Sequence, residues 1–202
     1  MAVEFNRSNT KENLMKAFAG ESQARNRYTI AADTCKKQSM YAVGEIFLFT
    51  AEQERAHAQR YYDLLKELSG NTIEISGGFP IDHHDDIVKL LESAHHNEME
   101  EYNDVYQAFG DEAKKEGFLE AASAFYQIAE IEQIHAKRFA KVKEMLESNT
   151  YFERSTSGMW MCLNCGHIQK GKAVPPLCPV CRYDRGYFIP AEMAPYLEMD
   201  FI

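Results

Sequence analysis

Two short segments of the chain each place a glutamate three residues before a histidine, as Glu54 with His57 and as Glu132 with His135. Residues three apart lie on one face of an α-helix, so each segment would present a carboxylate and an imidazole side by side. Carboxylate together with imidazole favours iron or manganese over softer metals. The two segments therefore predict two metal-binding positions, one at each Glu-x-x-His pair.

The two segments belong to an internal repeat. The residues AEQERAH at 51–57 recur as AEIEQIH at 129–135, an offset of 78 positions. The similarity extends further along the chain, where Arg60 corresponds to Arg138 at the same offset. Self-similarity at a fixed offset is typical of a duplicated structural unit. We therefore expect two similar pairs of helices, each of which carries one Glu-x-x-His pair.

Four segments carry an apolar stripe with alternating spacings of three and four residues, which predicts four long helices. Each stripe is interrupted near its middle by acidic residues or by a Glu-x-x-His pair. Ionised carboxylates buried together repel one another and are costly to remove from water without a cation. Because no Lys or Arg lies at that level of the stripes, we expect two multivalent metal ions there. The candidate metal ligands, which are also the candidate catalytic residues, are Glu21, Glu54, His57, Glu98, Glu101, Glu132 and His135.

One Glu from each of two helices, with a Glu-x-x-His pair from each of the other two, is the ligand pattern of carboxylate-bridged dimetal sites in ferritin-like four-helix bundles. A single pair would more often lie on a solvated helix face, but two pairs in matched repeats favour the metal site. Glu101 has no counterpart in the first stripe, where Ala24 stands at the equivalent position. We expect Glu101 to bind the nearby iron when that ion is ferric and to leave when it is ferrous. A permanent ligand or a neighbouring acid is the alternative role.

The expected bundle occupies residues 1–148, where Ala, Glu, Lys, Leu and Tyr are frequent and Pro80 is the single proline. Between the second and third helices, the segment 69–86 contains Gly, Pro and Asn and is longer than a simple turn needs. Such a segment is typical of a crossover that makes the two helices parallel, and a long surface loop is the alternative. The residues expected at helix ends, in chain order, are Ser8 or Asn9, Ser39, Asp82 or Asp85, and Gly117.

A second metal-binding pattern lies near the C-terminus, where the C-x-x-C pairs Cys162/Cys165 and Cys178/Cys181 are separated by twelve residues. Four thiolates at this spacing bind one tetrahedral ion, either zinc or iron. We expect a small metal-dependent module at residues 155–202, because so short a chain buries little core of its own. Zinc would be structural, whereas iron would make the module a one-electron carrier.

The 202-residue chain has 22 Lys and Arg against 31 Asp and Glu, a formal net charge of −9. This balance argues against a nucleic-acid binder and against docking on an anionic membrane. No apolar run approaches the roughly 20 residues that span a bilayer, and no secretory signal is visible, so we expect a cytoplasmic protein. No glycine-rich nucleotide-binding motif occurs, so electrons for a redox reaction would come from another protein.

Several other residues have a simpler interpretation. Tyr28, Tyr102 and Tyr106 could donate hydrogen bonds near the metals, although core aromatics are the more common case. Cys35 lies on the first stripe and is expected in the core. Four histidines off the ligand stripes are expected on a loop or an outer helix face: His83, His84, His95 and His96.

The combination of a dimetal bundle and a four-cysteine module resembles the rubrerythrin family. W-x-C-x-x-C-G, from Trp160 to Gly166, and C-P-x-C, at 178–181, are similar to the family's rubredoxin-like domain. The implied fold is mainly α, a ferritin-like di-iron four-helix bundle followed by a small rubredoxin-like domain. The resemblance covers nearly the whole chain. It implies two iron ions at the seven candidate ligands, a carboxylate-to-histidine switch that pairs Glu101 with His57, and one iron at the four cysteines.

The resemblance also implies a function. Family members similar to this chain are cytoplasmic peroxidases that reduce hydrogen peroxide to water in defence against oxidative stress. The four-cysteine iron would relay electrons from an external reductase or rubredoxin, which links the reaction to NAD(P)H. The alternative is a ferritin-like ferroxidase or iron-handling protein.

The separation of the two expected metal sites predicts an assembly. Fifteen residues of helix lie between Glu132 and Glu147, which is roughly 22 Å, so the module would be far from its own di-iron site. A head-to-tail homodimer, which the resemblance also implies, would bring the four-cysteine iron of one subunit beside the di-iron site of its partner.

Overall fold

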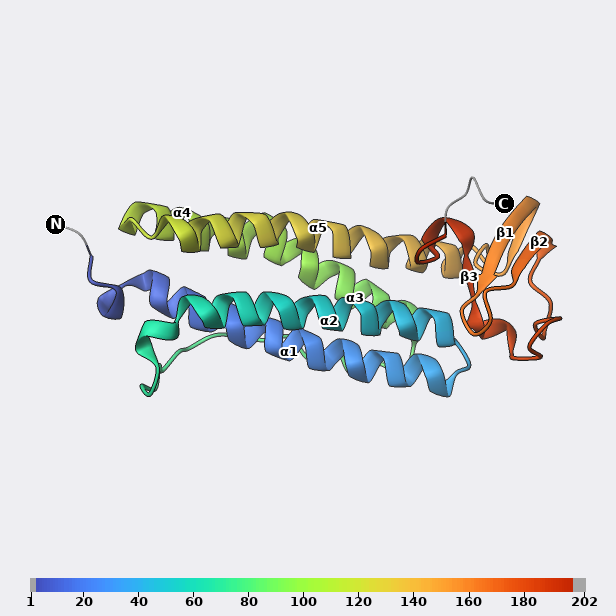
Figure 1. The fold of residues 1–202 in the computed structure, drawn as a ribbon, viewed down its shortest axis with the longest axis horizontal. Helices are drawn as coiled ribbons and strands as arrows, with labels where there is room; N and C mark the ends of the chain where they lie inside the picture. Colours follow the sequence, from blue (N-terminus) through green and yellow to red (C-terminus); the bar gives the residue numbers. More distant parts are fainter. Residues whose placement is uncertain (1–2, 198–202) are drawn as a thin grey trace.

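The computed structural model describes residues 3–197, so the last five residues of the predicted module, 198–202, lie outside the described residues. Long helices lie side by side in a bundle, and a small sheet lies at one end of it (Figure 1). No helix of the described part is both long and apolar enough to cross a membrane. Short 3-10 turns occur at Phe5–Arg7, Lys66–Leu68, Arg185–Tyr187 and Ala191–Met193.

The bundle consists of two antiparallel helix pairs, as the internal repeat predicts. Helices α1 (Asn9–Lys37) and α2 (Tyr41–Leu64) form the first pair. In the second pair, α3 (Ile87–Glu100) and α4 (Tyr106–Glu116) follow one another along the length of α5 (Leu119–Glu147). The predicted mainly α fold with a four-helix bundle is confirmed.

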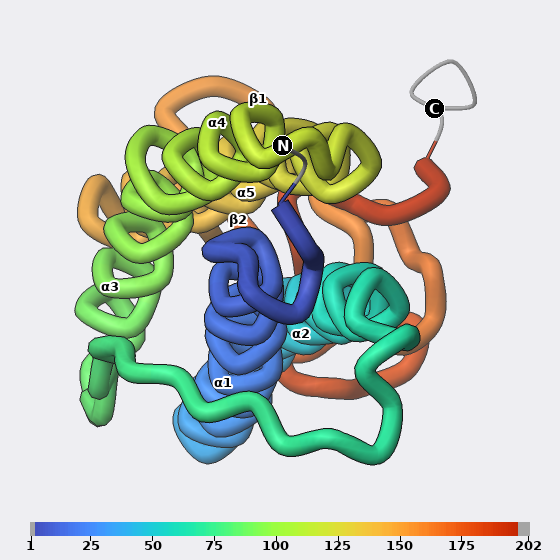
Figure 2. Tube along the Cα trace, turned by 90° about the vertical axis from the view of Figure 1, so that its left-hand side faces the viewer, coloured from blue at the N-terminus to red at the C-terminus, as the bar shows by residue number. Residues whose placement is uncertain are grey.

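The second and third helices run in the same direction, which confirms the predicted crossover. The segment 69–86 leaves the end of α2, passes across α1 and reaches the start of α3 without forming a helix or strand (Figure 2). Its last part is tied to the bundle by Asp82, whose carboxylate accepts hydrogen bonds from Arg27 and from Asn97. The crossover is therefore fixed against α1 and α3. It lies beside the acidic level of the bundle, which is the level at which glutamates such as Glu21 and Glu98 interrupt the apolar stripes.

Two of the predicted helix-end residues are confirmed. Ser8 caps α1, because its side-chain oxygen accepts a hydrogen bond from the backbone N–H of Lys11 at 3.0 Å. Gly117 ends α4 with a φ of 93°, a left-handed conformation that glycine adopts without steric cost.

The predicted starts of the second and third helices are wrong. Ser39 lies in the turn before α2 with a left-handed φ of 57°, and the helix begins two residues later. The cap of α3 is Asp86 rather than Asp82 or Asp85, and it accepts hydrogen bonds from two backbone N–H groups of the first turn at 2.8 and 3.2 Å. Asp82 is not available as a cap because Arg27 and Asn97 donate hydrogen bonds to its carboxylate.

A π-helical segment, Glu101–Val105, joins α3 to α4 and is missing from the sequence-based prediction. A π-helical turn holds one residue more than an α-helical turn, so the buried stripe moves by one position. Continued from Glu98 at alternating spacings of three and four residues, the third stripe predicts that Ala108 is buried. Ala108 is instead exposed, and Tyr106 and Gly110 are buried. A Cβ at Gly110 would lie 2.5 Å from the ring of Tyr126, so this glycine allows α4 to approach α5 closely.

Two apolar clusters fill the bundle, one on each side of the acidic level. The cluster nearer the sheet includes Cys35, which confirms the core position predicted for that residue. Full burial of one large apolar side chain contributes roughly 1.5–3 kcal/mol, so these clusters hold the helices at the acidic level in place. Large members are Phe47, Leu91 and Phe139 in the cluster nearer the sheet and Leu14, Tyr61 and Phe125 in the other.

The C-terminal module is a three-stranded antiparallel sheet in the order β2–β1–β3. The strands are β1 (Glu153–Cys162), β2 (Ile168–Ala173) and β3 (Phe188–Pro190). Trp160 of β1 is fully buried in the module, and its indole Nε1 donates a hydrogen bond to the carbonyl of Tyr151 at 2.7 Å.

The module packs tightly against the turn between α1 and α2. A Cβ at Gly186 would lie 1.6 Å from the carbonyl oxygen of Ser39, so only glycine fits there. The ring of Tyr187 stacks on that of Tyr41 with centroids 4.2 Å apart. Ile189 of β3 is buried in the apolar cluster of the bundle. These contacts fix the module at one end of the bundle.

Candidate metal centre

Six of the seven predicted bundle ligands converge in the middle of the bundle. They form two groups, and within each group one potential ligand atom per residue lies within 4.8 Å of the others. Two glutamates belong to both groups, so the groups share an edge. The first group is Glu21, Glu54, His57 and Glu132, and the second is Glu54, Glu98, Glu132 and His135.

The shared residues Glu54 and Glu132 each contact both histidines through different carboxylate oxygens. Nδ1 of His57 lies 3.2 Å from Oε2 of Glu54 and 3.0 Å from Oε1 of Glu132. Nδ1 of His135 lies 2.9 Å from Oε1 of Glu54 and 2.8 Å from Oε2 of Glu132. Carboxylates whose oxygens are divided between two imidazoles in this way have the arrangement of bridging ligands for a pair of ions.

The other two glutamates lie at opposite ends of the cluster. Oε2 of Glu21 is 3.7 Å from Nδ1 of His57, and Oε2 of Glu98 is 3.6 Å from Nδ1 of His135. Each position would therefore have one histidine and one outer glutamate of its own besides the two shared carboxylates. This matches the duplicated pattern that the repeat predicts.

Tyrosine hydroxyls orient the two outer carboxylates. Tyr106 of α4 donates a hydrogen bond to Oε1 of Glu21 at 2.6 Å, and Tyr28 of α1 donates to Oε1 of Glu98. In both cases the second oxygen of the carboxylate is left facing the cluster. Tyr28 and Tyr106 are thus hydrogen-bond donors as well as core aromatics.

Most of the other potential ligand atoms are buried without hydrogen-bond partners, which fits a site for cations. Among the described residues, Oε2 of Glu21 and both oxygens of Glu132 make no hydrogen bond. The same is true of Oε1 of Glu54, Oε2 of Glu98 and both ring nitrogens of His135. Buried polar atoms are nearly always paired in folded proteins, so a cluster of unpaired ones indicates ligands for ions.

Protons hold the cluster together where cations are lacking. Burial raises the pKa of Glu21 to about 8. Burial also acts to raise the pKa of Glu54, but the neighbouring imidazoles of His135 and His57 outweigh it and lower that pKa to about 2. Burial acts to lower the pKa of both histidines, but the neighbouring carboxylates raise it to about 10 for His57 and about 11 for His135. Metal ions would therefore bind in exchange for protons.

Glu101 is the one predicted bundle ligand outside both groups. It lies half-buried in the π-helical segment and lines a cavity of about 210 Å³. Burial raises its pKa well above the usual value, and the charges of Glu21 and Glu98 add to this effect. Glu101 is thus close to the cluster, and its role as a redox-dependent ligand stays a prediction.

Arg138 of α5 is a cation near the cluster that the stripes do not identify. Its guanidinium donates hydrogen bonds to Oγ1 of Thr50 at 2.8 Å and to Oε1 of Gln53 at 2.9 Å, which links α5 to α2. Burial lowers its pKa, and the charge of Glu54 acts in the opposite direction. The signal for this position was present in the sequence, because Arg138 follows His135 by three residues and so shares its helix face.

The four cysteines of the module also converge. The Sγ atoms of Cys162 and Cys181 are 3.8 Å apart, those of Cys165 and Cys178 are 3.7 Å apart, and all four lie within 4.8 Å of one another. Sulfurs about 2.3 Å from a central ion at the corners of a tetrahedron are about 3.8 Å apart. The observed spacing therefore fits one tetrahedral ion.

The four histidines predicted away from the ligands lie there. His83 and His96 are exposed. His84 contacts the hydroxyl of Ser93 at 3.4 Å, and Nδ1 of His95 lies 3.1 Å from the carbonyl oxygen of Ala136. None of the four belongs to the metal-binding groups found among the described residues.

Comparison with known protein families identifies both parts of the chain. The family model described as Rubrerythrin matches residues 12–143, and the one described as Rubrerythrin, rubredoxin-like domain, matches residues 160–189. Rubrerythrin-1 of Clostridium acetobutylicum is 44% identical over 180 residues, which cover 89% of this chain and 92% of that protein. The rubrerythrin of Nitratidesulfovibrio vulgaris is 38% identical over 185 residues, which cover 90% of this chain and 93% of that protein.

Solved structures agree with this assignment. Nigerythrin in its fully reduced, all-ferrous state matches with a TM-score of 0.62 and 27% identity over 94% of this chain and 88% of that one. Symerythrin from Cyanophora paradoxa shares the fold, with a TM-score of 0.60 at 23% identity over 73% of this chain and 89% of that one. Both matched domains, in the same order, together with relatives similar over most of their length, show that this chain belongs to the rubrerythrin family, with a ferritin-like di-iron domain and a rubredoxin-like domain.

Proposed function

We propose that this protein is a non-haem di-iron peroxidase that reduces hydrogen peroxide to water in the cytoplasm and protects the cell against oxidative stress. The observation that carries the proposal is the buried pair of ligand groups that share Glu54 and Glu132. Two metal ions held side by side match the two oxygen atoms of a peroxide. Membership of the rubrerythrin family supports the assignment of iron to this site.

The reaction joins one hydrogen peroxide, two electrons and two protons to give two molecules of water. Two ferrous ions at the cluster would supply one electron each and would polarise the oxygen–oxygen bond. Among the chain's own residues, Glu101 is the candidate proton donor, because it lines the cavity close to the cluster and burial raises its pKa well above the usual value. We infer that Glu101 passes protons from solvent to the reacting oxygen.

We propose an iron ion at the four cysteines, with zinc as the alternative metal. Iron there would return electrons to the bundle one at a time. The donor would be an external reductase or rubredoxin that takes electrons from NAD(P)H. Apolar side chains near the second C-x-x-C pair support such a contact, because Val180 is 65% exposed and Tyr183 is 47% exposed.

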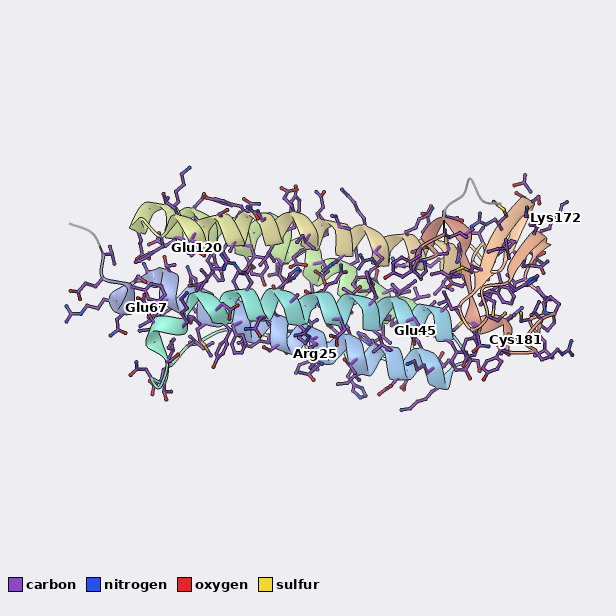
Figure 3. All side chains as sticks on the ribbon, in the orientation of Figure 1. Arg25, Glu45, Glu67, Glu120, Lys172 and Cys181 are labelled. Carbon is purple, nitrogen blue, oxygen red and sulfur yellow. The ribbon has the colours of Figure 1, made fainter. Side chains whose placement is uncertain are left out.

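We further propose that residues 1–148 form the di-iron domain and residues 155–202 the four-cysteine iron domain. We also propose that two chains form a head-to-tail homodimer. Cys181 lies in the module at one end of the molecule, far from Glu67 and Glu120 at the other end (Figure 3). The helix from Glu132 to its last residue is roughly 22 Å long, so a single electron transfer within one chain would be slow. A partner subunit in the opposite orientation would shorten that path.

A stopped-flow experiment tests the proposed reaction. Reduced, iron-loaded protein is mixed with hydrogen peroxide or with dioxygen, and oxidation of the iron is followed by absorbance. We expect faster oxidation by peroxide than by dioxygen. Glu132→Gln should abolish the difference, whereas Glu130→Gln, at an exposed position of the same helix, should retain it. Oxidation no faster with peroxide would contradict the proposal, and growth of a ferric mineral in a cage-like oligomer would indicate the ferroxidase alternative.

A further inference from the structure

A cavity of about 210 Å³ lies beneath the crossover segment and leads toward the ligand cluster. Residues of α1, of the end of α3 with the π-helical segment, of the start of α4, and of the crossover at 77–80 line it. One lining residue, Tyr106, donates a hydrogen bond to the ligand Glu21. One residue of the cavity wall is therefore hydrogen-bonded to a ligand of the proposed iron site.

The ligands themselves are shielded from solvent, so an oxidant needs a passage to reach them. Of the six clustered ligands, His57 is the most exposed at 7%, and Glu54 and Glu98 are each only 1% exposed. Of the bases that line the cavity, Arg27 is paired with Asp82, so the wall has no strong positive patch that would concentrate an anion, which favours an uncharged molecule. The ionisable lining residues are two bases and two acids. They are Lys16, Arg27, Glu100 and Glu101.

Gly20 leaves space in the wall of this cavity. It lies in the interior of α1, one residue before Glu21, where glycine destabilises a helix relative to alanine. No left-handed φ requires glycine at this position. A Cβ there would meet nothing closer than Oε1 of Glu101 and Cε1 of Phe79, both at 4.0 Å. The missing side chain therefore keeps open the gap between Glu101 and Phe79.

Phe79 forms the outer side of the same gap. The residue is 43% exposed and lies on the crossover segment after two glycines, Gly77 and Gly78, which add no side chain to the cavity wall. The following residue is fixed to α1, because the carbonyl of Pro80 accepts a hydrogen bond from the side chain of Gln23 at 2.7 Å. The ring is thus held at the mouth of the cavity by an anchored backbone.

We propose that this cavity is the passage by which a small uncharged oxidant reaches the iron site, and that Gly20 and Phe79 set its width. A methyl group at Gly20 would narrow the gap between Glu101 and Phe79, and removal of the Phe79 ring would widen it. The proposal rests on the proposed function only for the identity of the oxidant. Whether a small molecule reaches the metal through this cavity does not depend on which oxidant the protein uses.

The test combines one narrowing variant, Gly20→Ala, with one widening variant, Phe79→Ala. Ile81→Ala is the matched control, because Ile81 lies on the same segment, is 90% exposed and does not line the cavity. The first readout is the rate at which nitric oxide binds to the reduced, iron-loaded protein, measured by stopped-flow absorbance. The second is the ratio of the oxidation rates with cumene hydroperoxide and with hydrogen peroxide.

We expect Gly20→Ala to slow nitric oxide binding several-fold and Phe79→Ala to accelerate it. Phe79→Ala should also raise the ratio for the bulky hydroperoxide by about tenfold, the size of effect that one pocket-lining group commonly has on discrimination. Ile81→Ala should match the parent in both readouts. Unfolding midpoints and iron contents are measured for every variant, and Gly20→Ala is expected to be at least as stable as the parent.

Nitric oxide binding at the parental rate in both variants, with an unchanged hydroperoxide ratio, would overturn the passage. A parent that binds nitric oxide but reacts no faster with peroxide than with dioxygen would contradict the peroxidase assignment instead. In that case the nitric oxide rates of the variants still decide whether the cavity is the passage.

Discussion

Tyr106 and Glu21 are 85 positions apart in the chain, yet the tyrosine hydroxyl donates a hydrogen bond to Oε1 of the glutamate at 2.6 Å. Tyr28 makes the reciprocal bond, from α1 to Glu98 of α3. Helix α1 thus supplies Glu21 and the tyrosine that orients Glu98, whereas Glu98 lies on α3 and the tyrosine that orients Glu21 lies on α4, which follows α3 through the π-helical segment. The crossed hydrogen bonds connect the two ends of the site across the bundle.

The first prediction concerns Tyr106→Phe, which removes the hydroxyl and keeps the ring. Glu21 loses a buried donor, and loss of a group that orients a metal ligand commonly weakens metal binding 10–100-fold. We expect about tenfold weaker binding of one of the two ions, measured by titrating the metal-free protein with Co(II). Tyr126→Phe is the control, because its hydroxyl contacts the surface residue Asp111. Equal effects of the two variants would contradict the positioning role.

The second prediction is that the metal-free protein loses stability as the pH rises. The folded pKa is about 10 for His57 and about 11 for His135, both above the ordinary 6.5, so the fold retains protons that the unfolded chain releases. This stabilisation is complete below about pH 6.5 and is lost as the pH rises through the folded values. The pKa of Glu21 is also raised on folding, from 4.5 to about 8. Its contribution to stability is therefore lost in the same direction, as the pH rises from about 4.5 through about 8.

Thermal unfolding of the metal-free protein at about pH 6 and about pH 9 measures this effect, and the midpoint should fall between them. With metal present the trend should weaken or reverse, because bound ions replace the same protons and bind more tightly as the pH rises. A midpoint of the metal-free protein that increases over this interval would show that the histidines do not hold those protons.

The third prediction uses Trp160, the single tryptophan of the chain, as a reporter of the module. Its ring is fully buried beside Cys162 and Cys178. Cys165→Ser should remove the iron–thiolate absorption and shift the tryptophan emission to the red, because metal binding and folding of so small a module are coupled. The circular dichroism signal of the helices should be unchanged, because the helices belong to the bundle. Ser157→Ala, at an exposed position of β1, should change none of these signals. Unchanged emission in Cys165→Ser would mean that the module folds without its ion.

The fourth prediction tests the path of the electrons by mixing two inactive variants. Glu132→Gln disables the bundle, and Cys165→Ser disables the module. In a head-to-tail dimer, a mixed dimer has one intact bundle facing one intact module, so an equal mixture should recover about a quarter of the parental activity. Transfer within each chain would leave the mixture inactive, and that result would contradict the proposed assembly.

Much of the site follows from helical spacing alone. Glu54 and His57 must share a face because they are three residues apart, and the repeat places Glu132 and His135 in the same relation. The apolar stripes on either side then determine that this face is buried. The four cysteines were equally predictable, because a C-x-x-C pair brings its two thiolates together through local geometry.

The features that the sequence could not reveal depend on contacts between helices. Three aspartates near the start of α3 could each cap it. The contact with Arg27 excludes Asp82, and the hydrogen bonds from the first turn of the helix go to Asp86. The π-helical segment has no local signature, because the spacing of the third stripe remains acceptable without it. It becomes evident only when Tyr106 and Gly110, rather than Ala108, pack against the other helices.

That segment has a consequence for the duplicated architecture. The first repeat takes seven residues to advance from Glu21 to Tyr28, and the second takes eight from Glu98 to Tyr106. The wider turn absorbs the additional residue, so both tyrosines still reach their glutamates, while Glu101 is presented on one side of the bundle alone. The two otherwise similar halves thus differ by one additional residue, which would give two ions bound at the site unlike surroundings and a basis for unlike reduction potentials.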